Sequence, residues 1–332
     1  MDLVQSQNSQ LARSTDFPRF MGQPFPAVIA AAGPNAAERF LEFFLAHISN
    51  PNTRRAYGRA ALKFLNWLEE KHIELHNVRP LHVAAYVEGL KGTLAAPSVK
   101  QELSAIGELF DFLVTGQVVP LNPAASVKGP RYSIKKGKTI APTAEQVREL
   151  LDSIDTDDIV GLRDRAIIAS LFFSFARVEA LVKMRVEDYF PRGKRWWFRL
   201  HEKRGKEHEM PVHHLSKQYL DEYLRAAGIL ADEDAKTPLF RSAPRRSKTL
   251  TPNPLAQSNV YRMIQRRALA AGIADKIGCH SFRAAGITVY LQNGGEVETA
   301  QEMAAHGSIA TTRLYDRRNE EISLEEVERI RI

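Results

Sequence analysis

The chain has 332 residues, which is long for one domain and sufficient for two. Apolar residues make up 44% of it, so a sizeable core can form, and a formal charge of +7 favours polyanionic partners. The single cysteine, Cys279, excludes an internal disulfide and a multi-cysteine zinc cluster. No secretory signal and no stretch long enough to span a bilayer is found, so we expect a cytoplasmic, nucleoid-associated protein.

The character of the chain changes near residue 36. Residues 1–35 are polar and then interrupted by prolines, which is typical of a flexible N-terminal arm. Over residues 36–118 apolar residues recur at helical spacing, which predicts a compact bundle of short helices. The expected helices cover 37–47, a segment from Asn52 or Thr53 to 68, 81–90 and 98–113.

A basic, proline-rich segment follows at residues 119–142, and it fits two interpretations. One is a solvated linker, which a charge run alone favours; the other is a basic strap that lies along a phosphate backbone between two domains. The candidate catalytic residues further along the chain favour the strap. Its basic residues are Lys128, Arg131, Lys135, Lys136 and Lys138, with no acidic residue among them.

Residues 143–332 form the second predicted domain. Thr143 and Gln146 make a capping box at the start of a helix, and two short strands on either side of a turn predict a hairpin. The fold class is therefore mostly α with a small β-hairpin or sheet. The strands are expected at 196–200 and 209–212, and the helices at 144–154, 162–175, 215–227, 258–271, 281–293, 298–306 and 324–332.

Two spacings suggest phosphate chemistry. His280 and Arg283 lie at i and i+3, so on a helix they project from one face, where both can bind one phosphate. Such pairs are also common on helix surfaces, and Tyr315, nine residues after His306, could be an ordinary packing tyrosine. Four histidines cluster near the hairpin, and we interpret them as solvent-exposed side chains and not as a zinc site. These are His201, His208, His213 and His214.

Taken together, the motifs resemble those of the tyrosine recombinase (phage-integrase-like) family, over residues 36–332. The order of the motifs and the nine-residue spacing before the tyrosine carry the resemblance. The stretches are Gly161-Leu-Arg-Asp-Arg165, Phe175-Ala-Arg177-Val, Lys203-Arg-Gly-Lys206-Glu, His280-Ser-Phe-Arg283, His306 and Thr311-Thr-Arg-Leu-Tyr315-Asp. The implied enzyme is a simple two-domain recombinase of the Xer-like type, with an N-terminal helical DNA-binding domain and an α+β catalytic domain.

The resemblance implies an active site that breaks and rejoins DNA strands without a metal or a nucleotide cofactor. Tyr315 is the implied nucleophile, and two arginines clamp the scissile phosphate and neutralise the charge that builds on its oxygens. Arg177 lies in apolar sequence, where an unpaired guanidinium is costly, so it needs a phosphate or carboxylate partner. The implied catalytic residues are Arg177, Lys203, His280, Arg283, His306 and Tyr315.

The remaining catalytic residues would move protons and bind the phosphate. His280 helps to take the tyrosine proton, and Lys203 protonates the leaving 5′-hydroxyl. His306 donates a hydrogen bond to a phosphate oxygen. Lys206 lies on the same turn as Lys203 and could take its place.

Three positions depart from the family pattern. Phe175-Ala176 replaces the usual Gly-Leu before the first arginine, and Ala305 replaces the usual glycine before His306. Ala180 stands where the family has an acidic residue that supports the active site. Glu179 is one position earlier, and one position on a helix is a large rotation, which argues against Glu179 taking over that role. We therefore expect a divergent subfamily, with slower or differently regulated chemistry.

The resemblance further implies a C-shaped clamp around double-stranded DNA with an inverted-repeat core site, a homotetramer on synapsed DNA, and scope for an accessory directionality protein. The terminal helix 324–332 is expected to dock on a neighbouring protomer. Basic residues expected to contact DNA, each of which could also be an ordinary solvated charge, are Arg54, Arg55, Arg59, Lys63, Lys100, Lys135, Lys136, Arg245, Arg246, Arg262 and Arg266. Arg241, Lys248 and Arg267 extend the same basic segments.

The predicted function is site-specific DNA recombination through a 3′-phosphotyrosyl intermediate and a Holliday junction, in integration, excision or resolution of a mobile element. Two alternatives remain open at this point. A type IB topoisomerase-like relaxase uses similar chemistry without exchanging partners. A catalytically silent DNA-binding regulator would keep the fold without the activity.

Overall fold

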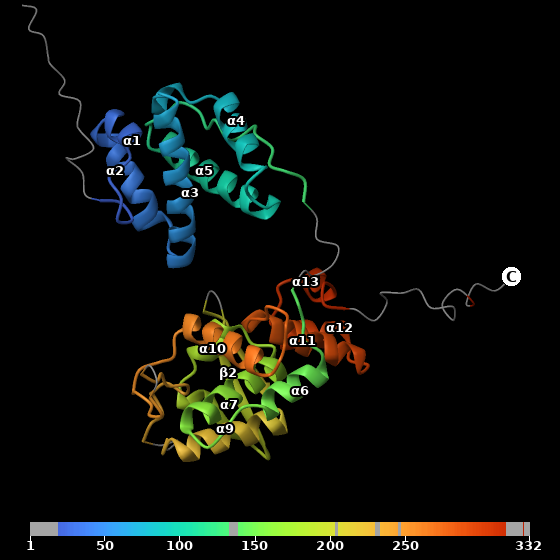
Figure 1. Cartoon of the computed structure of the whole chain (residues 1–332). Helices are drawn as coiled ribbons and strands as arrows, with labels where there is room; N and C mark the ends of the chain where they lie inside the picture. Colours follow the sequence, from blue (N-terminus) through green and yellow to red (C-terminus); the bar gives the residue numbers. More distant parts are fainter. Residues whose placement is uncertain are drawn as a thin grey trace, which may run out of the picture. The chain divides into compact units, whose positions relative to one another are not determined.

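The computed structural model describes residues 19–132, 139–202, 205–229, 233–244, 247–316 and 328. The chain divides into two compact units, Met1–Ser133 and Ile134–Ile332. The first is helical, and the second combines helices with a small sheet (Figure 1). Within the described residues, no helix is long and apolar enough to cross a membrane, and no group of metal-binding side chains is found.

The N-terminal unit is a bundle whose helices begin at prolines or polar caps. Proline fits the first turn of α2, α3, α4 and α5, where its missing N–H is not needed. The Asn50 side chain accepts hydrogen bonds from the Asn52 and Thr53 amides at 2.9 and 3.2 Å, so the cap of α3 is Asn50 and not Asn52 or Thr53 as expected. The bounds are α1 (Ala27–Ala31), α2 (Pro34–Glu42), a π-helical turn (Phe43–His47), α3 (Pro51–Glu70), a 3-10 turn (Leu75–Asn77), α4 (Pro80–Leu90) and α5 (Ala96–Thr115).

Part of the predicted flexible arm is a folded part of this bundle. The Phe20 ring packs against Phe40 and Phe44 with centroids 4.9 and 4.8 Å apart, and Ile29 in α1 is fully buried. The Glu69 carboxylate accepts a hydrogen bond from the first amide of α1. The prolines that suggested an arm lie between apolar residues, and burial of those residues outweighs the absence of a helical period. Residues 1–18 lie outside the described part of the chain.

The start of the predicted linker also packs on the bundle. Val119 and Ala124 are buried, and the Asn122 amide donates to the Asp111 carboxylate at 2.7 Å. Residues 133–138, which include Lys135 and Lys136, lie outside the described residues, so the strap interpretation stays a prediction.

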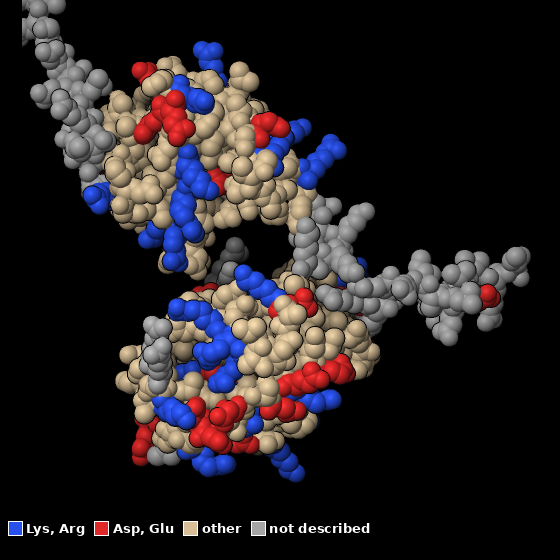
Figure 2. Space-filling view, in the orientation of Figure 1, with Lys and Arg blue, Asp and Glu red and all other residues tan. Residues whose placement is uncertain are grey.

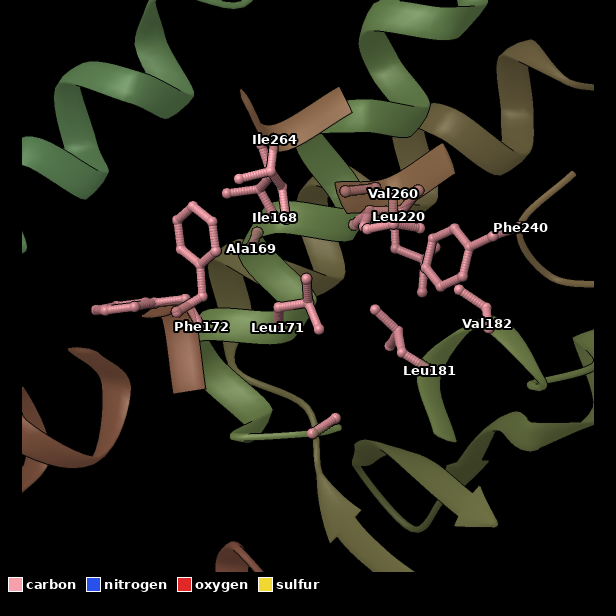
Figure 3. Close-up of a cluster of buried hydrophobic side chains, with 14 of the residues drawn as sticks. Ile168, Ala169, Leu171, Phe172, Leu181, Val182, Leu220, Phe240, Val260 and Ile264 are labelled. Atoms are coloured by element: carbon pink, nitrogen blue, oxygen red, sulfur yellow. The ribbon is translucent and has the colours of Figure 1, made fainter. Parts of the chain in front are cut away.

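The C-terminal unit is built around the buried helix α7 (Ile159–Ser174). Its apolar side chains, such as Ile168 and Leu171, pack with Leu220 of α9 and with Val260 and Ile264 of α10 (Figure 3). The other helices are α6 (Ala144–Asp152), α8 (Val178–Val182), α9 (His214–Ala226), α10 (Gln257–Ala270), α11 (Cys279–Gln292), α12 (Val297–Met303) and α13 (Ile309–Arg313), and a 3-10 turn covers Val186–Asp188.

The described sheet has three antiparallel strands in the order β1-β2-β3. These are β1 (Tyr189–Arg192), β2 (Arg195–His201) and β3 (Glu207–Pro211), with Phe198 opposite both Tyr189 and Met210. The sequence predicted β2 and β3 but not β1, because β1 has only four residues, one of which is proline. The predicted capping box of α6 is confirmed, with Thr143 and Gln146 exchanging hydrogen bonds of 2.9 and 3.2 Å.

One glycine sets the distance between α7 and α11. A Cβ on Gly286 of α11 would lie 2.1 Å from the carbonyl oxygen of Phe172 and 2.8 Å from the Phe175 ring. Only glycine therefore lets α11 approach the end of α7 this closely, and α11 carries the His280 and Arg283 side chains near its N-terminus.

Candidate active site

Arg283 is almost fully buried and joins three segments of the chain. Its side chain leaves α11 with only 1% of the residue exposed. One terminal nitrogen donates to the Phe175 carbonyl after α7, and the other donates to the Ala304 carbonyl after α12. Its Nε is buried without a hydrogen-bond partner in the described residues. Burial and the nearby Arg177 lower the pKa of Arg283 to about 10, so the guanidinium stays positive at neutral pH.

Both turns next to Arg283 have left-handed backbones at residues other than glycine. Phe175, whose own carbonyl binds Arg283, has a φ of 53°, and Ala305, directly after the Ala304 carbonyl, has a φ of 46°. These are the two positions where the resemblance leads one to expect glycine, the residue that adopts a left-handed backbone most readily. A non-glycine residue in this conformation costs about 1–2 kcal/mol. The two carbonyl bonds to a buried charge help to hold these turns in place.

Tyr315 follows α13 and lies between two histidines. His280 Nε2 is 2.8 Å from the Tyr315 hydroxyl, and the His306 ring stacks on the Tyr315 ring with centroids 5.9 Å apart. The tyrosine is 8% exposed, and the Thr288 hydroxyl of α11 donates to its backbone carbonyl at 3.1 Å. Burial raises the pKa of Tyr315, while Arg283 and Arg177 act in the opposite direction. The two arginines therefore favour the phenolate that a nucleophile requires.

The two histidines are held in their neutral forms. Burial, followed by the charges of Arg283 and Arg177, lowers the pKa of His280 below its ordinary value, and the same causes lower that of His306 to about 3. His306 Nδ1 lies 2.9 Å from the buried Thr312 hydroxyl. If this hydroxyl is the donor, Nε2 of His306 carries the proton and can donate to a phosphate oxygen. A neutral His280 can accept the proton of Tyr315.

Arg177 has the carboxylate partner that its apolar surroundings predicted. It occupies the N-cap position of α8, and its guanidinium donates to Glu202, which follows β2. Arg177 acts electrostatically on His280, His306 and Tyr315. The structure thus brings five of the predicted catalytic residues into one site. The sixth, Lys203, lies outside the described residues, and its alternative Lys206 is solvent-exposed.

Three residues of this site were not predicted from the sequence: Glu202, Thr288 and Thr312. Thr312 lies inside one of the stretches that carry the family resemblance, and Glu202 directly precedes another. Nothing in their spacing indicates which side chain they contact. As the helical rotation predicted, Glu179 does not take the place of the acidic residue missing at Ala180. It pairs instead with Lys183 at 2.8 Å.

The predicted DNA-contact residues that the structure describes lie on helix surfaces. Figure 2 shows Lys and Arg side chains along α3 in the N-terminal unit and over α10 in the C-terminal unit. On α3, Arg54 donates to the Ile48 carbonyl at 2.8 Å, Arg55 to Asn52, and Lys63 to Glu102 at 2.7 Å, while Arg59 is exposed. Lys100 of α5 and Arg262 of α10 are also exposed. Arg245 and Arg246 lie outside the described residues.

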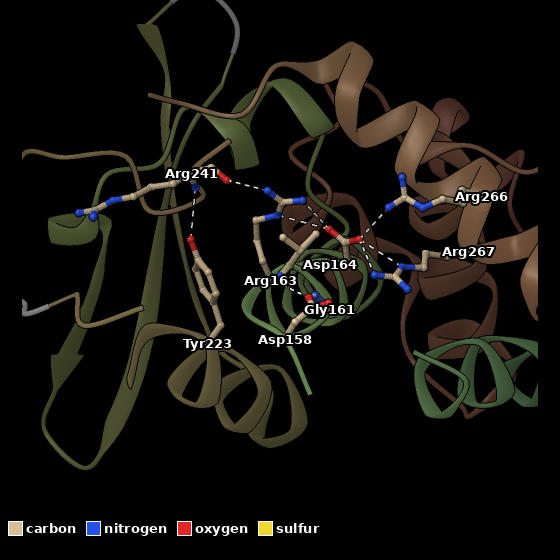
Figure 4. Close-up of polar contacts among 9 residues, drawn as sticks. Asp158, Gly161, Arg163, Asp164, Tyr223, Arg241, Arg266 and Arg267 are labelled. Carbon is tan, nitrogen blue, oxygen red and sulfur yellow. Dashed lines mark hydrogen bonds and ion pairs between the residues drawn. The ribbon is translucent and has the colours of Figure 1, made fainter. Parts of the chain in front are cut away.

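A buried carboxylate organises the basic end of α10. Asp164 of α7 is fully buried and accepts hydrogen bonds from Arg163, Arg266 and Arg267 at 2.8–3.1 Å (Figure 4). One carboxylate thus faces three guanidiniums, so the group keeps a net positive charge. The Arg266 side chain is 62% exposed despite this contact. It can therefore still reach a solvent-borne anion.

The chain has a helical unit followed by an α+β unit. In the second unit a buried tyrosine contacts a histidine and lies within the electrostatic field of two arginines. This combination defines the tyrosine recombinase class. The chain belongs to the phage integrase family, which matches residues 142–321. The N-terminal SAM-like domain of phage integrases matches residues 37–117.

Curated relatives and solved structures agree with this assignment. Tyrosine recombinase XerC of Myxococcus xanthus is 29% identical over 288 residues, covering 83% of this chain and 91% of that protein. Tyrosine recombinase XerD of Chlorobaculum tepidum is 27% identical over 289 residues, covering 83% and 90%. The XerH recombinase bound to palindromic difH substrate has a TM-score of 0.67 at 18% identity, covering 89% of this chain and 87% of that one. A lambda integrase tetramer bound to a Holliday junction has a TM-score of 0.64 at 16% identity, covering 84% and 76%.

Proposed function

We propose that this protein is a site-specific DNA recombinase that cleaves and rejoins strands through a 3′-phosphotyrosyl intermediate. The observation that carries the proposal is the 2.8 Å contact between His280 Nε2 and the Tyr315 hydroxyl, next to a buried arginine whose Nε has no partner among the described residues. A buried donor without an acceptor is uncommon in proteins. A non-bridging oxygen of a DNA phosphate is an acceptor of the right charge for it.

In the proposed reaction the Tyr315 oxygen attacks the scissile phosphorus while its proton passes to His280. The bond from phosphorus to the 5′-oxygen breaks, and the leaving 5′-oxygen takes a proton, for which Lys203 remains the proposed donor. Arg177 and Arg283 neutralise the charge on the phosphate oxygens, and His306 donates a further hydrogen bond. Attack by the 5′-hydroxyl of another strand reverses the step, so the energy of the phosphodiester is kept.

The proposed substrate is double-stranded DNA with an inverted-repeat core site. Positive side chains along α3 and α10 support this, because each contact to a phosphate releases condensed counterions. Lambda integrase and XerH recombinase have been solved with DNA, the former as a tetramer on a Holliday junction. We propose a homotetramer on synapsed DNA and a clamp formed by both units of each protomer. The docking helix expected at 324–332 lies outside the described residues and remains part of this proposal, as does an accessory directionality protein.

Two alternatives are less well supported. A type IB topoisomerase-like relaxase has similar chemistry, but the matched families are those of integrases and the curated relatives are recombinases. A silent DNA-binding regulator is disfavoured because His280 contacts the Tyr315 hydroxyl, His306 stacks on the Tyr315 ring, and the electrostatic fields of Arg177 and Arg283 act on the same tyrosine.

A covalent-trapping experiment tests the proposal. Tyr315→Phe protein first selects its binding site from random duplex DNA, and suicide substrates nicked near the centre of that site are then incubated with wild-type protein. We expect a protein–DNA adduct with wild type and none with Tyr315→Phe. Tyr261→Phe, at an exposed tyrosine of α10, is the matched control and should still form the adduct. No adduct with wild type would overturn the proposal, and relaxation of supercoils on any sequence without recombinant product would support the relaxase.

A further inference from the structure

Glu202 is an acidic residue directly after β2, and its side chain is nearly buried. Its backbone N–H donates to the Lys206 carbonyl at 2.7 Å, which closes the turn between β2 and β3. Its side chain is only 7% exposed and accepts a hydrogen bond from Arg177. A buried carboxylate is stable only when it is paired, so its position depends on this arginine.

Arg177, in turn, depends on Glu202 for its side-chain position. The Arg177 side chain is 33% exposed, and in the described part of the chain Glu202 is the only hydrogen-bond partner of its guanidinium. The carboxylate nearest in sequence, Glu179, is paired with Lys183. Arg283 donates to the backbone carbonyl of Phe175, so it fixes the main chain before Arg177 but not the side chain.

We propose that Glu202 is a positioning residue that holds the Arg177 guanidinium in place to receive the scissile phosphate. This inference rests on the proposed function. An arginine has five N–H donors, so one bond to Glu202 leaves the others free for phosphate oxygens.

Loss of the contact between Glu202 and Arg177 should affect the rate of strand cleavage and not the affinity for DNA. An arginine side chain has several rotatable bonds, and an untethered guanidinium samples many positions away from the phosphate. A misplacement of 1 Å in a catalytic group can lower the rate by about 100-fold. Loss of the Glu202 charge should therefore slow strand cleavage by up to about 100-fold while affinity for the selected site changes little.

The test measures the rate of strand cleavage on the suicide substrate for Glu202→Gln and Glu202→Asp. The amide has the same shape but cannot form the charged pair, and we expect the larger fall for it and an intermediate rate for aspartate. Glu209→Gln is the matched control. Glu209 pairs with Arg192 and Arg199 on the same sheet, and its loss should leave the cleavage rate unchanged.

A substrate with a neutral methylphosphonate at the scissile position separates positioning from a general structural role. With one phosphate charge removed, cleavage depends less on Arg177, so the defects of Arg177→Ala and Glu202→Gln should both shrink on this substrate. The double variant should be no slower than Arg177→Ala alone on ordinary DNA. A wild-type rate for Glu202→Gln, or a defect that persists on the methylphosphonate, overturns this inference alone. Absence of any adduct with wild type overturns the proposed function and this inference with it.

Discussion

The two arginines of the candidate active site should respond differently to the same conservative substitution, lysine. Arg283 is almost fully buried and donates to two carbonyls from separate turns, Phe175 and Ala304. A lysine has one nitrogen and cannot reach both, so at least one buried carbonyl loses a charged donor, at a cost of about 2–4 kcal/mol. The Arg177 side chain is one-third exposed and makes one ion pair, and a lysine can keep the positive charge there. Arg177→Lys should therefore reduce the free energy of unfolding by less than about 1 kcal/mol.

Differential scanning calorimetry of the full chain measures this difference. For a domain the size of the C-terminal unit, 1 kcal/mol corresponds to about 2–4 °C in Tm. Arg283→Lys should therefore lower the Tm of the transition of that unit by about 5–15 °C, and Arg177→Lys by no more than about 4 °C. Both variants should lose strand cleavage. Equal Tm shifts for the two variants would refute the argument that Arg283 also holds the two turns together.

Three further outcomes follow from the geometry of the C-terminal unit. Gly286→Ala should destabilise the protein by about 2–3 kcal/mol in urea unfolding, because its Cβ would overlap the α7 carbonyl; Gly89→Ala, in open space on α4, should instead stabilise by about 1 kcal/mol. Ala305→Gly relieves a left-handed backbone and should raise stability by up to about 1 kcal/mol, and a lower Tm would contradict that reasoning. The pKa values of His280 and His306 are lowered on folding, so the unfolded chain binds more protons below pH 6.5 and stability should fall as the pH drops from there. His306→Asn should weaken this pH dependence in thermal unfolding, and an unchanged dependence would argue against a buried neutral His306.

The sequence by itself indicated the family and most helices, and it named the residues that we propose as catalytic. Helix caps and apolar stripes depend on residues a few positions apart, so the capping box at Thr143 and the buried α7 could be predicted. Tyr315 could be predicted as the nucleophile because the motifs occur in a fixed order, and that role stays a prediction. The need of Arg177 for a charged partner followed from its apolar neighbours alone.

Only the tertiary structure decided which groups these residues contact. Glu202 lies 25 residues from Arg177, and Arg283 lies 108 residues from the carbonyl of Phe175. Contacts at that separation depend on how α7, α11 and the hairpin pack, and no local spacing encodes them. The left-handed backbone at Phe175 and Ala305 has the same origin, because these residues lack the local preference for it that glycine has. The packed segment around Phe20 was missed because burial, not helical period, orders it.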